Sequence, residues 1–150
     1  MEEAAKAYAS MVKLMFMGMG ALSKAFYEKY GKEALPIITE VASQGGVEYG
    51  KVMQQMTPAK GMKAVGELFK MMDSMVGEGM EIIELSDDAF HFKVSQCPVG
   101  IEGTSKELCE AMMTSEKKMM SIFLGQEVEM RIPKSVAAGD EKCEVIYSIK

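Results

Sequence analysis

The spacing of apolar residues changes near residue 79, and this change constrains the fold more than any other feature. Before it, apolar residues recur every three or four positions, as on one face of a helix. After it, several segments alternate apolar and polar residues, as in a half-buried strand. We therefore expect a single α+β domain over residues 1–150, with a helical part at 1–78 and a ββαββ part at 79–150.

The helical part predicts three helices, over about 3–29, 32–56 and 58–76. Gly45-Gly46 either divides the second helix or allows another element to pack closely against it. Thr57-Pro58 ends the second helix, and we expect it to start the third. Threonine is a favoured N-cap and proline a favoured first helical residue.

The second part predicts a small antiparallel β-sheet, packed with the N-terminal helices. Two strand pairs are expected, at 80–85 and 90–94, and at 128–132 and 143–149. One further helix lies between the pairs and ends near Leu124, before Gly125. Thr104 and Glu107 fit a capping box at its start. Pro133 ends the third strand or marks it as an edge strand.

The charge and hydropathy of the chain narrow its partners and its location. The net charge is −5 at pH 7, which argues against a nucleic-acid partner, because such partners need a basic face. No apolar run reaches the length of a membrane span. The chain opens with the acidic Met1-Glu2-Glu3 instead of a basic signal region. We therefore expect a cytoplasmic protein.

Three cysteines, Cys97, Cys109 and Cys143, all fall in the second part. Their spacing is not that of a compact metal knuckle. Each cysteine nevertheless lies near the end of a predicted strand or helix, and these ends converge if the helix packs on the sheet. Three thiolates suit zinc or an iron–sulfur cluster. The alternative is that all three are buried, inert thiols.

The 17 methionines and the single histidine have less specific interpretations. We expect most methionines to fill the core, and some to line an adaptable apolar ligand pocket. His91 is placed on the polar face of its strand, where a solvated role is expected ahead of a metal-binding or catalytic one. Three amphipathic helices exceed what a small sheet covers, which is compatible with a homodimer.

Several short motifs, taken in order, resemble known families. They are Phe90–Val94, Gln96-Cys97-Pro98, Leu108-Cys109-Glu110 and the closing segment Ala138–Glu144 with its Gly-Asp-x-x-Cys. This series resembles the L-2-amino-thiazoline-4-carboxylic acid hydrolase-like family, and is similar to hydrocarbon-binding domains named after a vinyl reductase.

The resemblance implies an α+β fold with a ligand pocket between helices and sheet. In the vinyl-reductase-type domains it implies a structural metal held by cysteines beside an aromatic-ligand pocket. Those domains usually carry a further cysteine before the Gly-Asp turn. Here that stretch is Ile132–Ser135, which has no thiol.

Three functions follow from these observations. The first is a cytosolic domain that binds a small apolar or thiol-containing ligand, with Cys97, Cys109 and Cys143 holding a metal or iron–sulfur centre beside a Met-rich pocket. The second is a hydrolase of a thiazoline or cyclic amidine carboxylate, with a carboxylate such as Asp140 or Glu110 moving protons. The third is an interaction module with inert cysteines.

Overall fold

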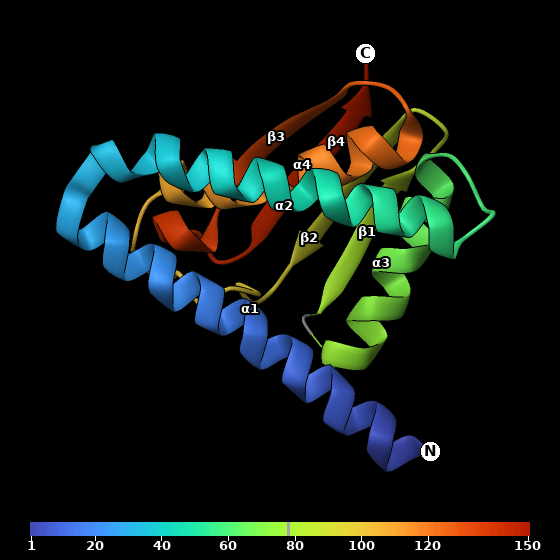
Figure 1. Cartoon of the computed structure of the whole chain (residues 1–150), viewed down its shortest axis with the longest axis horizontal. Coiled ribbons are helices and arrows are strands. Elements are labelled where there is room, and N and C mark those ends of the chain that lie inside the picture. Colours follow the sequence, from blue (N-terminus) through green and yellow to red (C-terminus); the bar gives the residue numbers. More distant parts are fainter. Residues whose placement is uncertain (78) are drawn as a thin grey trace.

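A computed structural model describes residues 1–77 and 79–150 and confirms the α+β fold. Helices α3 and α4 pack on a four-stranded sheet, α2 packs on α4, and α1 lies outermost (Figure 1). The helices are α1 Glu2–Tyr30, α2 Ala34–Met56, α3 Met62–Val76 and α4 Lys106–Leu124. The strands are β1 Met80–Leu85, β2 Ala89–Val94, β3 Val128–Lys134 and β4 Cys143–Ile149.

The sheet has the strand order β1-β2-β4-β3, and every neighbouring pair is antiparallel. Phe90, Phe92 and Val94 are buried on one face of β2, as the alternation predicts. β3 is an edge strand, and it contains Pro133 because an edge position does not need the N–H that proline lacks. Cys143 pairs with Val94, so the end of β2 meets the start of β4.

Two predicted helix starts are wrong by a few residues. The N-cap of α4 is Ser105, whose hydroxyl accepts a hydrogen bond from the Leu108 N–H at 3.1 Å. Thr104 instead donates its hydroxyl to the Ile101 carbonyl at 2.6 Å. The third helix starts at Met62, after Gly61 with φ +90°, and not at Pro58. Thr104 and Ser105 both carry a hydroxyl at the start of α4, and only that of Ser105 accepts a hydrogen bond from the first turn of the helix.

Gly46 and Gly50 let α2 pack directly against α4. A Cβ atom at Gly46 would collide with the Ser115 carbonyl of α4. At Gly50 it would lie 2.7 Å from both the Met119 carbonyl oxygen and the Ile122 Cβ. The second helix is therefore continuous, and its glycines serve close packing and not a break.

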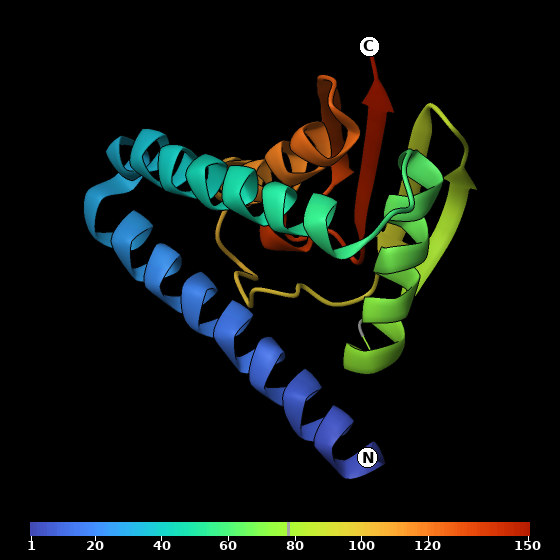
Figure 2. The same cartoon turned by 45° about the vertical axis from the view of Figure 1, so that its right-hand side comes forward.

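The helix α1 makes little contact with the rest of the chain. Only Ala9 and Gly20 are buried on it, and its N-terminal half extends beyond the other elements (Figure 2). Many of its methionines are exposed. Among the described residues only Met53, Met62, Met119 and Met120 are buried methionines, so the expectation that most of them fill the core is wrong.

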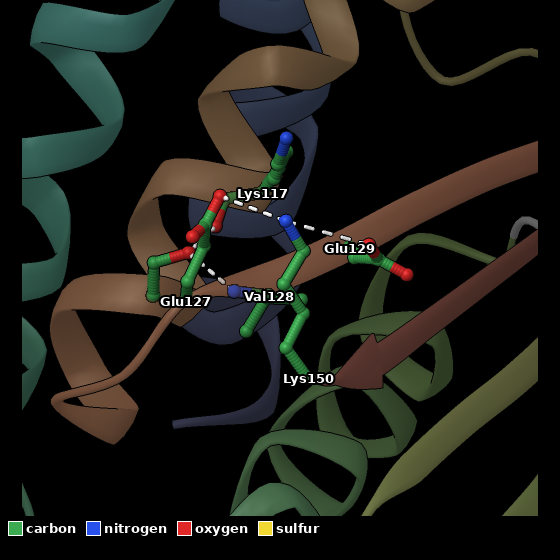
Figure 3. Close-up of polar contacts among 6 residues, drawn as sticks. Lys117, Glu127, Val128, Glu129 and Lys150 are labelled. Carbon is green, nitrogen blue, oxygen red and sulfur yellow. Dashed lines mark hydrogen bonds and ion pairs between the residues drawn. The ribbon is translucent and has the colours of Figure 1, made fainter.

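Polar contacts fix the connection from α4 to β3. The Val128 N–H donates to the Ser121 hydroxyl at 3.2 Å. Lys150 lies between Glu127 and Glu129, with its Nζ 3.5 Å and 3.4 Å from their carboxylate oxygens (Figure 3). These contacts hold the end of β4 beside the start of β3. None of the helices in the described ranges has the length and hydropathy of a membrane span.

Candidate functional site

The three cysteines, which we call the thiol cluster, come from three different elements. Cys97 follows β2 and is half-buried, Cys109 lies in the first turns of α4, and Cys143 begins β4. The last two are buried. The charges of Cys143 and Cys97 both act to raise the pKa of Cys109, and Cys97 also acts on Cys143. The three sulfur atoms are therefore within electrostatic reach of one another.

The closing segment of the sequence builds one wall of this cluster. Gly139 adopts φ +100°, a conformation that favours glycine, and turns the chain back. The Asp140 carboxylate then accepts the Ser135 N–H at 2.8 Å, and the Asp140 N–H donates to the Ser135 carbonyl at 3.1 Å. This closed loop directs the Val136 N–H onto the Cys143 sulfur at 3.3 Å. The Gly-Asp-x-x-Cys motif, Gly139 to Cys143, therefore has a structural role, since it forms the turn that brings the Val136 N–H to the Cys143 sulfur.

Burial keeps the two inner thiols protonated at neutral pH. Loss of solvation raises the pKa of Cys109 from 9.0 to about 11, although the nearby Ser135 hydroxyl acts to lower it. Burial also raises the pKa of Cys143, against the opposing effect of the Val136 N–H. Both groups are consequently neutral and weakly nucleophilic in this arrangement, because the thiolate is the reactive form.

Ser135 is the residue that the sequence analysis missed. Its side chain is fully buried, and its hydroxyl oxygen has no hydrogen-bond partner of good geometry among the described residues, although it makes a side-chain contact with the Cys109 thiol. It lies near enough to Cys109 to affect the pKa of that thiol. The one sequence signal for it was its place in the stretch Ile132–Ser135, where the domains that the sequence resembles carry a cysteine. In this chain the Ser135 hydroxyl lies beside the Cys109 thiol instead.

A second buried polar group lies close to Cys109. Tyr147 is fully buried and donates its hydroxyl to the Glu116 carboxylate at 3.0 Å. Burial raises its pKa well above 10, and Glu116 adds to the shift. Cys109 also acts to raise the pKa of Tyr147, so the two side chains lie in the same part of the interior. Tyr147 therefore stays a neutral hydrogen-bond donor.

His91 lies apart from the thiol cluster, on the opposite face of the sheet. Its Nε2 is 2.8 Å from a Glu144 carboxylate oxygen, and both side chains are mostly buried. Phe90, Phe92 and Cys143 alternate with these two residues along their strands and point to the core. His91 consequently has no direct route to the thiols.

The geometry of the thiol cluster does not fit a three-ligand metal centre as it stands. In residues 1–77 and 79–150, no three His, Cys, Asp or Glu side chains are grouped so that they hold one metal ion. The predicted zinc or iron–sulfur site at Cys97, Cys109 and Cys143 stays a prediction.

An open groove lies between α2, α4 and β3. Its lining mixes apolar side chains with polar and charged ones: Leu35, Ala111, Met130 and Ile132 lie beside Thr39, Glu107, Glu110, Thr114 and Lys117. None of the three cysteines lines it, and neither does Ser135. The groove is open to solvent, so the enclosed pocket expected from the resemblance is not formed there.

Comparison with known proteins shows the fold alone. No family profile matches the chain, and no curated protein sequence matches it. The solved structures with a similar fold include the following two. One is the phenol-responsive sensory domain of the transcription activator PoxR with phenol, at 14% identity and a TM-score of 0.64, covering 89% of this chain and 74% of that chain. The other is a trafficking protein particle complex subunit 3 from Naegleria fowleri covalently bound to palmitic acid, at 13% identity and a TM-score of 0.65, covering 92% and 94%.

Proposed function

We propose that this chain is a ligand-binding domain for a small molecule with an apolar body and one polar group. The polar group of the ligand reaches the buried Ser135 hydroxyl at the thiol cluster. This function agrees with the ligand-binding alternative of the sequence analysis. It differs from that alternative in one respect, because the polar group of the ligand contacts the Ser135 hydroxyl as well as the thiols.

The observation that carries the proposal is the buried hydroxyl of Ser135, which has only the weakly hydrogen-bonding Cys109 thiol beside it and no partner of good geometry among the described residues. A buried polar group without a partner costs about 1–3 kcal/mol. That cost is recovered when a ligand group donates to or accepts from the hydroxyl. An unsatisfied polar atom beside neutral thiols is therefore suited to a ligand with a hydroxyl or carboxyl group.

The chemistry of the structural neighbours supports the same class of ligand. The similar sensory domain is described with phenol and the similar trafficking subunit with palmitic acid. Both molecules join an apolar body to one oxygen-bearing group. Met119 and Met120 of α4 and Met130 of β3 lie in or against the core. These flexible side chains adapt readily to a ligand of irregular shape.

Thermal denaturation with phenol and palmitate as probes tests the proposal. We expect at least one probe to raise the Tm of the chain, since a ligand that binds only the folded state stabilises it. In Ser135→Ala the dissociation constant of that probe should rise about tenfold. The matched control is Ser148→Ala on β4, which should bind as the parent does.

Ser135→Ala also separates a binding role from a structural one. Removing an unsatisfied hydroxyl should leave the unliganded protein as stable as the parent, or more stable by up to about 1–3 kcal/mol. A variant that loses stability and binding together would contradict the proposal, because it would show that the hydroxyl has a structural partner. Absence of a Tm shift with either probe would also contradict it.

Elemental analysis tests the metal prediction separately. We expect stoichiometric zinc or iron in anaerobically prepared protein, and its loss in Cys109→Ala and Cys143→Ala, if the three thiols hold a metal centre. Protein that binds a probe without metal would favour the ligand site alone. The two measurements are independent, since the probe experiment does not need the metal.

A further inference from the structure

The outward face of α1 carries an apolar stripe with the spacing of a helix–helix seam. We call the following six residues the α1 seam: Tyr8, Met11, Met15, Gly18, Leu22 and Ala25. Their separations alternate between three and four residues, which is the heptad pattern of a paired helix. All six are exposed.

The opposite face of α1 is the one that packs on the chain's own core. Gly20 lies against the Val99 carbonyl, where a Cβ atom would collide, and Ala9 is buried on the same side. At 100° per residue the α1 seam is centred about half a turn away from Gly20. A Cβ atom at Gly18 would meet nothing within 4 Å. The contacts with its own domain therefore leave the α1 seam open.

The area of this surface is that of a stable interface. Tyr8, Met11 and Met15, with the neighbouring Leu14, Met19 and Leu22, are between 53% and 74% exposed. With about 190 Å² per side chain, within the range for aromatic residues, they present roughly 700 Å² of apolar surface. Monomers rarely expose a larger apolar patch than about 300–600 Å², whereas a specific interface buries about 800 Å² on each partner.

We propose that the α1 seam pairs with the α1 seam of a second copy of this chain, in an antiparallel, two-fold symmetric dimer. In the antiparallel orientation the seam is complementary to itself. A two-fold axis between Met15 and Gly18 places a large residue opposite a small one in two of the three pairs, and two residues of similar size opposite each other in the third. The resulting pairs are Tyr8 with Ala25, Met11 with Leu22, and Met15 with Gly18.

The charges of α1 agree with this orientation. Between residues 7 and 23 the only charged residue is Lys13, which lies on the side that packs on the domain. At the ends, the antiparallel alignment brings Glu3 of one copy next to Lys29 of the other. A parallel alignment would place the acidic ends of the two helices together. Unlike charges at the ends of the seam therefore favour the antiparallel dimer.

Sedimentation equilibrium of the full chain and three variants tests the dimer. We expect the parent to be dimeric. Met15→Glu and Gly18→Glu place a charge in the seam, and each should raise the dimer dissociation constant more than about a hundredfold, because each dimer buries the charge twice. Gly18→Glu also replaces a mid-helix glycine by a better helix former, so the monomer should remain folded.

Met17→Glu is the matched control. It introduces the same charge on the same helix, but Met17 lies off the seam and should leave the dissociation constant nearly unchanged. A monomeric parent, or a dimer that survives both seam variants, would overturn the proposal. So would a Met17→Glu variant that dissociates as readily as Met15→Glu, because this would show a general effect of charge on α1.

Discussion

The helices α1 and α2 contain similar pairs of glycines, yet the glycines have different surroundings. In α2, Gly46 and Gly50 both lie against α4, and the two helices pack closely along their length. In α1, Gly20 touches the Val99 carbonyl, while Gly18 faces open space. Spacing accounts for part of the difference, because residues four apart lie on one face of a helix and residues two apart do not. The difference separates an inner layer of α2, α4 and sheet from an outer helix.

The largest expected effect is at the α2–α4 contact. Gly46→Ala should destabilise the chain by about 2–4 kcal/mol, because the new Cβ meets the backbone carbonyl of Ser115, which cannot turn away as a side chain would. Chemical denaturation measures the change. Gly45→Ala is the control, since its Cβ meets nothing within 4 Å, and it should be stabilising by about 0.5–1 kcal/mol. Equal effects at the two sites would refute the close packing of α2 on α4.

The pH dependence of stability should report the burial of Cys109 in the inner layer. Its pKa is about 11 in the folded chain against 9.0 ordinarily, so the folded state keeps a proton that the unfolded state has lost. The proton on Cys109 therefore contributes about 2–3 kcal/mol to the free energy of unfolding. This stabilisation is fully present below pH 9 and is lost as the pH rises from 9 to 11. Urea unfolding across this range measures it.

Two variants isolate this titration from other alkaline effects. Cys109→Ala should reduce the dependence of unfolding free energy on pH between 9 and 11, and the slope that remains should come from Cys143 and Tyr147, whose pKa values burial also raises. Cys97→Ala, at a half-buried position outside the helix and sheet, should retain most of it. If both variants behave alike, the buried thiol is not the source of the slope.

The smallest of these effects is expected on α1. Gly20→Ala should cost about 1–2 kcal/mol, less than Gly46→Ala, because a helix with few other contacts can shift away from Val99. Gly18→Ala should be stabilising by about 0.5–1 kcal/mol, when it is measured below the dissociation constant of the proposed dimer. A loss at Gly20 as large as that at Gly46 would show that α1 belongs to the inner layer.

The secondary structure of this chain could be predicted because its signals are local. The change from helical to alternating spacing, the stop at Gly125 and the edge position of Pro133 each depend on a few neighbouring residues. The N-cap of α4 was placed one residue early, because Thr104 and Ser105 both carry a suitable hydroxyl. Which of the two caps the helix depends on the path of the preceding loop.

The candidate site could be predicted only in part. The cysteines were chosen by residue type, and their element ends do approach each other. The residue type of Ser135 gives no comparable signal, because a serine after a strand is ordinarily solvated. Its burial follows from the Gly139 turn, which folds the segment back over Cys143.

The sequence by itself determined the α+β class, the element order and the residues with thiol chemistry, since spacing and residue type are written along the chain. Tertiary structure alone decided which apolar faces are covered. Burial depends on what packs against a helix, so similar methionine-bearing stripes end in the core for α4 and at the surface for α1. The same physical reason left the Ser135 hydroxyl buried without a partner of good geometry.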